Sequence, residues 1–229
     1  MESLRTTSAH VIVEPEVLDG AEIVLDGDTE HHLRRVVRLR DGETVSVTDG
    51  RGRWRLTSVR LQGSDLLLES TGEVVVSPPR PDPLTLAVAM PKGDRLDWLV
   101  QKVTEIGVDR IVLLHAERSV VRWKPEKAPA QLARLQRIAD EAGRQSRRVW
   151  RVEIEAPVPA VDVLDRFVVA EPGGRRIGPD DRSVAIGPEG GWSDRELDAA
   201  RDRVTLGANI LRTETAAVAT SALCVAFER

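Results

Sequence analysis

Residues 184–227 read VAIGPEGGWSDRELDAARDRVTLGANILRTETAAVATSALCVAF, and this stretch decides the expected fold. The apolar run 184–186 predicts a buried strand, which ends at the glycine-rich turn 187–191. Ser193 with Glu196 is typical of a capping box and therefore predicts that a helix begins at Ser193. The first part of the stretch is thus a strand, a glycine turn and a helix.

The second part repeats the order, because the apolar run 204–206 ends at Gly207 and a last helix is expected from near Thr213 to the C-terminus. Alternation of this kind favours an α/β fold with a parallel sheet. Two glycine turns at one edge of such a sheet form a crevice, which is where open α/β sheets bind ligands. We interpret it as a cofactor site made mostly of main chain; two ordinary tight turns are the alternative. Neither turn has the GxGxxG or GxxxxGK[ST] pattern of dinucleotide and P-loop sites.

Upstream residues extend the same pattern. Apolar runs predict four more strands, and Glu171 follows the last of them directly, so three strand ends, at Glu171, Gly187 and Gly207, are expected to converge on one site. A helix capped by Asp94 should end at Gly107, with its inner face on Leu96, Leu99, Val100, Val103 and Ile106. A long helix is expected over 130–145, and the four strands over 84–89, 110–114, 152–154 and 167–170.

The first 72 residues are rich in short predicted strands, at 10–13, 21–25, 43–48, 53–59 and 65–69, and this spacing favours a small barrel. A helix over 29–39 should interrupt them, capped by Asp28 or Thr29, with Leu33, Val36 and Val37 on its apolar face. Residues 73–83 carry four prolines and predict a stiff linker between an N-terminal domain, 1–72, and a C-terminal domain, 84–229.

The composition and the distribution of charge limit the classes of function that are expected. The chain has 229 residues and a formal net charge of −4, yet residues 34–60 carry eight arginines against three acidic side chains, and residues 92–151 carry fourteen basic against eight acidic ones. Local basic surface suits a polyanion, although a solvated, salt-bridged surface is the alternative. The single cysteine, Cys224, excludes a disulfide framework and is expected to lie in the core. No apolar run reaches membrane-spanning length and no signal peptide is visible, so we expect a soluble cytoplasmic protein.

A histidine pair and a tryptophan are considered as a metal site and as an RNA contact. His31 and His32 are adjacent and would point to different sides of a helix, so no metal site is expected. Trp54 lies among arginines and could stack on RNA, or it could be a core residue of the barrel.

Four motifs in order give the chain a specific resemblance, which covers nearly its whole length. They are MPKGDR (90–95) with QKVTEIG (101–107), ERSVV (117–121), IGPEGGWS (186–193), and LG…ILRTETAA (206–217). Together they resemble the bacterial ribosomal small subunit RNA methyltransferase E family of the SPOUT superfamily. His31, His32 and Leu33, followed by Val36, Val37 and Arg38, extend the resemblance into the N-terminal region.

The resemblance implies an N-terminal PUA-like RNA-binding barrel and a C-terminal α/β domain with a deep trefoil knot. It implies S-adenosyl-L-methionine as cofactor, N3-methyluridine in 16S rRNA near the decoding centre as product, and a homodimer that serves ribosome biogenesis. As catalytic residues we expect Arg212, to stabilise charge on the uracil, and Glu189 or Glu214, as base or orienting group. A structural salt bridge between Arg212 and Glu214 is the alternative.

The resemblance also implies two binding sets. The expected cofactor-binding residues are Glu171, Ile186, Gly187, Pro188, Glu189, Gly190, Gly191, Leu206, Gly207, Ile210, Leu211, Thr213 and Ala216. The expected RNA-binding residues are Arg34, Arg35, Arg38, Arg53 and Arg55, with Lys92, Arg95, Arg118 and Arg122 nearer the target base.

The chain departs from the family pattern at Arg144, where an acidic residue is usual, and at Ala208–Asn209, which replaces a turn with a basic residue. These departures concern substrate contacts more than activity. Two other functions remain: a SPOUT enzyme that methylates the ribose 2′-OH or another base, and a non-catalytic RNA-binding assembly factor. The second would need the basic surface but not the glycine crevice.

Overall fold

The computed structural model of the protein describes residues 2–63 and 65–227. The chain divides into two compact units, one of residues 1–79 with 143–151, the other of residues 80–142 with 152–229. Within the described ranges no helix is both long and apolar enough to cross a membrane. The division into two units differs from the expected one, because the N-terminal unit runs through most of the proline-rich segment and includes a distant piece, Gly143–Arg151.

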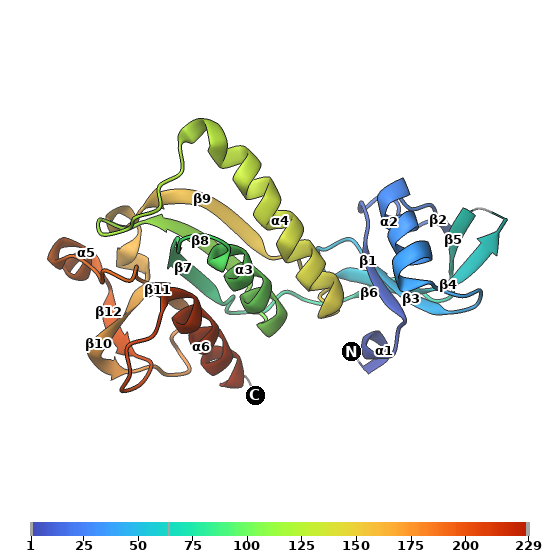
Figure 1. Ribbon diagram of the computed structural model, residues 1–229. Helices are drawn as coiled ribbons and strands as arrows, with labels where there is room; N and C mark the ends of the chain where they lie inside the picture. The colour runs from blue at the N-terminus through green and yellow to red at the C-terminus, as the bar shows by residue number, and fades with distance from the viewer. Residues whose placement is uncertain (1, 64, 228–229) are drawn as a thin grey trace. The chain divides into compact units, whose positions relative to one another are not determined.

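The N-terminal unit is built on one six-stranded sheet in the order β1-β3-β4-β5-β2, with β6 paired to β4 (Figure 1). Only β1 and β3 run parallel; the other pairs are antiparallel. All five expected strands form, and β6 adds a pairing inside the segment expected to be only a linker. The elements are α1 (Glu2–Arg5), β1 (Ala9–Ile12), β2 (Glu22–Ile23), α2 (Gly27–His31), the π-helix η1 (His32–Val37), β3 (Thr44–Thr48), β4 (Arg53–Gln62), β5 (Asp65–Ser70) and β6 (Val75–Val76).

The helix expected over 29–39 is different in two ways. It begins earlier, because the Asp26 carboxylate accepts a hydrogen bond from the Thr29 amide at 2.9 Å and caps α2. It then continues as a π-helix, whose wider turn moves Val36 and Val37 to the surface, where they are 65% and 39% exposed. Leu33 is the one residue of η1 that is buried in the core, so the expected three-residue apolar face was wrong.

A buried polar network in this unit joins β1, β3 and the distant segment. His10 is 3% exposed; its Nδ1 lies 2.8 Å from the Ser46 hydroxyl and its Nε2 lies 2.8 Å from the Arg148 carbonyl oxygen. Arg147, which has a positive φ of 59°, donates to the Thr7 carbonyl at 2.9 Å. Segment 143–151 is thus held to the sheet by hydrogen bonds that no local sequence pattern indicates.

His10 makes the stability of this unit depend on pH. Burial lowers the pKa of the His10 imidazole from 6.5 to about 4, because the charged ring is poorly solvated there. The unfolded chain binds a proton at the higher pKa, so stability should fall as the pH decreases between these values, by ~3 kcal/mol in total.

Urea denaturation of the wild type and of His10→Gln, between about pH 7 and about pH 4.5, measures this slope. The variant should lose most of the slope, whereas His31→Gln, at an exposed position, should keep it. A wild type equally stable at both pH values would contradict the prediction.

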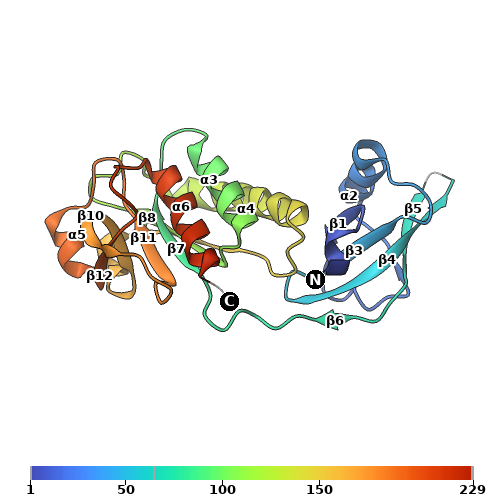
Figure 2. The same ribbon diagram turned by 90° about the horizontal axis from the view of Figure 1, so that it is seen from below.

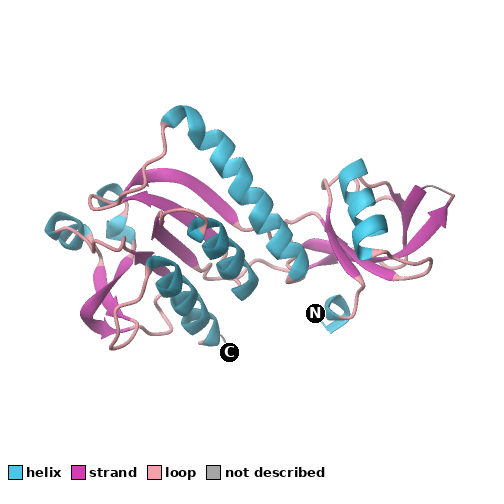
Figure 3. Cartoon of the chain, in the orientation of Figure 1, coloured by secondary structure: helices cyan, strands magenta, loops and turns pink. Residues whose placement is uncertain are grey.

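The C-terminal unit is a six-stranded parallel sheet in the order β12-β10-β11-β7-β8-β9. Figure 2 shows α3, α4 and α6 on one side of it, and Figure 3 distinguishes strands from helices. The elements are β7 (Thr85–Ala89), α3 (Arg95–Ile106), β8 (Arg110–His115), η2 (Pro125–Lys127), α4 (Ala128–Gln145), β9 (Glu153–Pro159), η3 (Ala160–Asp162), η4 (Leu164–Arg166), β10 (Val168–Arg176), β11 (Ser183–Ile186), α5 (Asp194–Ala199), β12 (Asp202–Thr205) and α6 (Thr213–Ala226).

Alternation along the central strands supplies two cores. Leu86 and Val88 of β7 pack with α3, α4 and α6, whereas Ala87 and Ala89 pack with Trp192 and the η3–η4 region on the other face. Burial on both faces explains why these strands read as continuous apolar runs. Cys224 of α6 is buried in the first core, as expected.

Several details differ from expectation, among them the end of β9, which was expected at residue 154 and lies at Pro159. Glu171 lies inside β10 rather than after it, because that strand continues past an irregularity between Ala170 and Arg175 in its pairing with β12. Asp94 occupies the N-cap position of α3 but has helical backbone angles and makes no side-chain capping bond. The last helix ends at Ala226, and residues 228–229 lie outside the described part.

Candidate functional site

A cavity of about 310 Å³ lies at the carboxyl ends of β11 and β12 and beside the irregularity that follows Ala170 in β10. Its position is that of ligand sites in open α/β sheets, and its volume is within the range of small-molecule sites. Every residue expected to bind cofactor lines it, and so do Ala170, Pro172, Trp192, Thr205, Ala208 and Asn209. Glu171, Gly187 and Gly207 therefore line one site as expected, although Glu171 comes from within β10 and not from its end.

Glycine is required in the first loop by close approach. A Cβ on Gly187 would lie 2.9 Å from Cε2 of the buried Trp192, and Gly191 has a φ of 70°, in the left-handed region. The Thr213 hydroxyl donates to the Gly187 carbonyl at 2.9 Å, so α6 is tied directly to this loop. The loop is consequently a tightly held wall of main chain that presents peptide groups to the cavity.

The expected capping box is confirmed, and it holds a second loop as well. The Ser193 hydroxyl accepts from the Glu196 amide at 3.2 Å, and the Glu196 carboxylate accepts from the Ser193 amide at 2.9 Å. The other oxygen of this fully buried carboxylate accepts from the Glu117 amide at 2.8 Å. Helix α5 therefore fixes the loop after β8 beside the glycine loop.

The loop after β8 brings Arg118 to the cavity wall. Arg118 donates to the Gly190 carbonyl at 3.3 Å, and a Cβ on Gly190 would lie 3.2 Å from the Arg118 Cβ. Arg122 turns back to the Ala116 carbonyl at 3.2 Å and stays exposed. Of the two, Arg118 is the one that contacts the loop lining the cavity.

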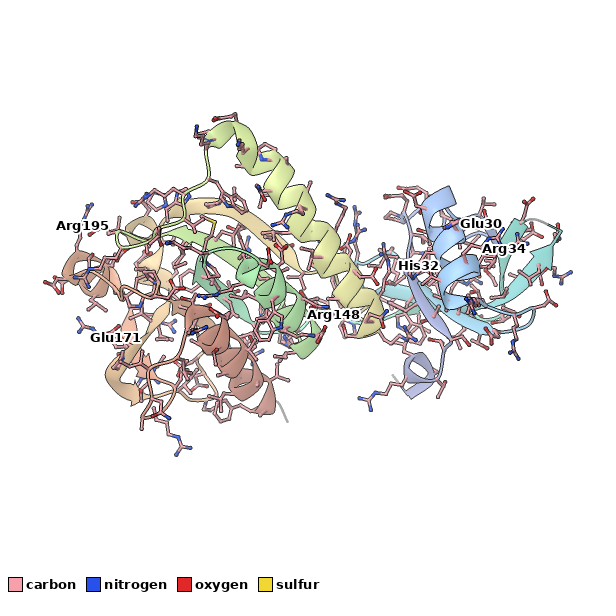
Figure 4. All side chains as sticks on the ribbon, viewed as in Figure 1. Glu30, His32, Arg34, Arg148, Glu171 and Arg195 are labelled. Atoms are coloured by element: carbon pink, nitrogen blue, oxygen red, sulfur yellow. The ribbon has the colours of Figure 1, made fainter. Side chains whose placement is uncertain are left out.

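Glu171 is the acidic side chain of the β10 wall (Figure 4). Partial burial raises the pKa of its carboxyl, while the positive charges of Arg203 and Arg118 oppose that shift. A half-buried carboxylate at a main-chain-lined cavity can accept hydrogen bonds from hydroxyl or ammonium groups of a ligand.

The three expected catalytic residues lie in neighbouring loops but in different environments. Arg212 is the exposed N-cap residue of α6, Glu189 has 45% of its side chain exposed, and the Glu214 side chain only 11%. Arg95 lies 3.4 Å from Glu189 and 3.7 Å from Glu214, measured between charged atoms. The salt bridge between Arg212 and Glu214 is not formed in the described ranges; Arg95 takes that place.

The expected RNA-binding residues of the N-terminal unit divide into two kinds. Figure 4 shows Glu30 and Arg34 on the side of their helix that faces β5; Arg34 donates to the Gly63 carbonyl at 2.8 Å, while Arg35 and Arg38 are exposed. Arg53 and Arg55 are held more firmly within the unit, by an acidic side chain and by three carbonyl groups respectively. Arg53 pairs with Asp19 at 2.5 Å, and Arg55 donates to the carbonyls of Leu18, Gly20 and Gly72.

Trp54 is a core residue. It is 6% exposed and its indole N–H donates to the Ser77 hydroxyl at 3.1 Å, so stacking on RNA is not available to it. Across residues 2–63 and 65–227, no group of three or more His, Cys, Asp or Glu side chains could hold a metal ion.

Comparison with known proteins defines the class. The RNA methyltransferase domain family matches residues 78–225, and the RNA methyltransferase PUA domain family matches residues 25–60. The protein is therefore of the RNA methyltransferase class, with an α/β unit that carries the cavity.

Individual relatives narrow this class. The chain is 33% identical to ribosomal RNA small subunit methyltransferase E of Synechocystis over 90% of its length and 73% of that protein, and 31% identical to the Bacillus subtilis protein over 90% of both. A crystal structure of the Neisseria gonorrhoeae protein bound to S-adenosyl methionine superposes with a TM-score of 0.80 at 26% identity, covering 93% of this chain and 95% of that one. The chain belongs to the ribosomal RNA small subunit methyltransferase E family.

Proposed function

We propose that the protein is an S-adenosylmethionine-dependent methyltransferase that methylates N3 of a uridine in the decoding region of 16S rRNA. The cavity at the glycine loops is the observation that carries the proposal, because a non-catalytic RNA-binding protein would not need it. The Neisseria gonorrhoeae relative, which is bound to S-adenosyl methionine, supports the same cofactor here.

The residues present are suited to this cofactor. Main-chain groups of the 186–191 and 206–211 loops can bond the adenine edge, and the Glu171 carboxylate can accept from the ribose hydroxyls or the amino group. The apolar side chains Ile186, Leu206 and Ile210 can cover the ring. S-adenosylmethionine supplies a methyl group on a sulfonium, which is already activated, so the protein contributes position and electrostatics.

Two tasks remain for the protein's own side chains. Uracil N3 carries a proton that must be removed, and Glu189 or Glu214 would receive it or orient the base. Negative charge then spreads to the uracil oxygens, where Arg212 would stabilise it. Both roles follow from the family resemblance together with the position of these residues at the rim of the cavity.

For the RNA we propose phosphate contacts by Arg34, Arg35 and Arg38 of the N-terminal unit, and contacts nearer the target base by Lys92, Arg95, Arg118 and Arg122 of the C-terminal unit. Arginine forks bind phosphate well. Arg53 and Arg55 are weaker members of the set, because Arg53 is paired with an acidic side chain and Arg55 bonds three carbonyl groups, whereas Arg34 bonds one. We also propose a PUA-like barrel, a trefoil knot around the cofactor loops, a homodimer and a cytoplasmic location.

Transfer of labelled methyl groups to purified small ribosomal subunits tests the proposed activity. We expect incorporation close to one methyl group per subunit that lacks the modification, and no incorporation into large subunits. Binding of small subunits without any transfer, at saturating S-adenosylmethionine, would instead support an assembly factor.

A further inference from the structure

The feature that the proposed function leaves unexplained is the position of Arg95. It is the first residue of α3, where a positive charge is unfavourable because the amino end of a helix is itself positive. Asp94 before it makes no side-chain capping bond, and Asp97 is the acidic residue of the first turn. The Arg95 charge must therefore be compensated by partners outside its own helix, and a residue kept against a local preference is often a functional one.

Two carboxylates, one from the glycine loop and one from the first turn of α6, hold the Arg95 guanidinium. Its Nη1 lies 3.4 Å from Glu189 of the glycine loop, and its Nε lies 3.7 Å from Glu214 of the first turn of α6. Glu189 lines the cavity, as do Thr213 and Ala216 on either side of Glu214. Three segments that are far apart in the sequence, the start of α3, the glycine loop and the start of α6, therefore meet at one cation at the rim.

The two carboxylates differ in what they can do. Glu214 is 9% exposed, and its Oε2 is buried without a hydrogen-bond partner in the described ranges. Its compensation comes from the Arg95 charge and from the amino end of α6, which favours an anion in the first turn. Glu189, with 45% of its side chain exposed, is open to a substrate. Glu214 is thus an anchor, and Glu189 is the accessible carboxylate.

Arg95 keeps access to solvent despite this clamp. Its side chain is 43% exposed and neither ion-pair distance is a short hydrogen bond, so the guanidinium can still donate to a substrate. Arg212, by contrast, is exposed and has no carboxylate fixing its position in the described ranges. Preorganised donors stabilise developing charge better than donors that must be ordered during the reaction.

We propose that Arg95, anchored by Glu214, is the cation that contacts the target uracil and lowers the cost of removing its N3 proton. The proton passes to the Glu189 carboxylate, while the electron pair stays on the ring and spreads to the oxygens, to which Arg95 donates. This inference rests on the proposed function. It gives Arg95 the role first expected for Arg212, and it makes Glu214 a positioning residue.

The experiment compares Arg95→Ala with Arg110→Ala, a matched control. Arg110 also lies between two carboxylates, Glu153 and Glu155, with a similar exposed fraction, but at the opposite edge of the same sheet. Three quantities are measured: the dissociation constant of S-adenosylmethionine, that of the small subunit without cofactor, and the single-turnover rate of methylation against pH. Thermal melting checks that each variant is folded.

We expect Arg95→Ala to lower the single-turnover rate about 100-fold while both dissociation constants change less than about threefold. Its rate should also continue to rise at alkaline pH where the wild-type rate levels off, because a nearby cation lowers the pKa of the uracil N3. Arg95→Lys should recover part of the rate. Glu214→Gln should lower it about tenfold, with little further loss when combined with Arg95→Ala.

Three results would overturn this inference but leave the proposed function standing. The first is an Arg95→Ala rate equal to that of the Arg110→Ala control, and the second is a pH profile unchanged from the wild type. The third is a loss confined to small-subunit affinity, which would make Arg95 a phosphate contact. A wild type that yields no N3-methyluridine would overturn the proposed function and this inference together.

Discussion

Replacement of Gly187 by arginine is expected to weaken binding of S-adenosylmethionine about 100-fold or more. The structural reason is twofold. A long side chain at this position would enter a cavity of only about 310 Å³, and its Cβ alone would lie 2.9 Å from the Trp192 ring. Calorimetric titration of the purified protein measures the effect.

Two companion variants make this result specific. Gly187→Ala should weaken binding less, because it only displaces Trp192. Gly178→Ala should bind as the wild type does, since the added Cβ would lie 3.8 Å from the nearest atom, an ordinary contact, at a backbone conformation open to alanine. A folded Gly187→Arg variant with wild-type affinity would place the cofactor elsewhere.

Glu196→Gln is expected to lower the free energy of unfolding of the C-terminal unit by about 2–3 kcal/mol. The two oxygens of the buried Glu196 carboxylate accept from the Glu117 and Ser193 amides. Glutamine has the same shape but only one acceptor oxygen, so its NH₂ group would face one of these amides and leave a buried donor unpaired. Urea denaturation followed at constant pH measures the loss.

The matched control for this variant is Asp198→Asn, an exposed change of the same kind on the same helix. It should change stability by less than about 0.5 kcal/mol. Since Glu196 also holds the loop that carries Arg118, Glu196→Gln should weaken methylation of the small subunit as well. Equal stability of the two variants would show that the bond to Glu117 contributes little.

The amino-acid sequence allowed most of the C-terminal unit to be predicted, because its signals are local. Glycine after an apolar run, and serine three residues before glutamate, indicate element ends directly. All the predicted cofactor residues line one cavity for this reason. The extension of β10 past Ala170 escaped prediction, since its proline and two glycines read as a turn.

Contacts between distant segments could not be predicted. The bond from the Glu117 amide to Glu196 spans 79 residues, and the bond from His10 to the Arg148 carbonyl spans 138; neither leaves a spacing pattern. The Arg95 clamp is of the same kind. Sequence motifs brought Arg95, Glu189 and Glu214 to attention separately, but only the packing of three loops shows that they form one cluster.

The partners of surface arginines could not be predicted, for the same physical reason. Charge runs indicate where arginines occur but not what they bond to, and Arg55 uses its guanidinium to hold three carbonyl groups of its own unit. The Trp54 indole likewise donates to the Ser77 hydroxyl of its own unit. Whether a polar side chain faces the solvent depends on neighbours that periodicity does not identify.

The central claim is that this protein methylates N3 of a uridine in 16S rRNA. Chromatography and mass spectrometry of nucleosides from a small-subunit RNA treated with enzyme and S-adenosylmethionine, followed by mapping of the modified fragment, test it most directly. We expect N3-methyluridine in a decoding-region fragment, absent without enzyme. A product of 2′-O-methylated ribose, or a methyl group on another base, would contradict it.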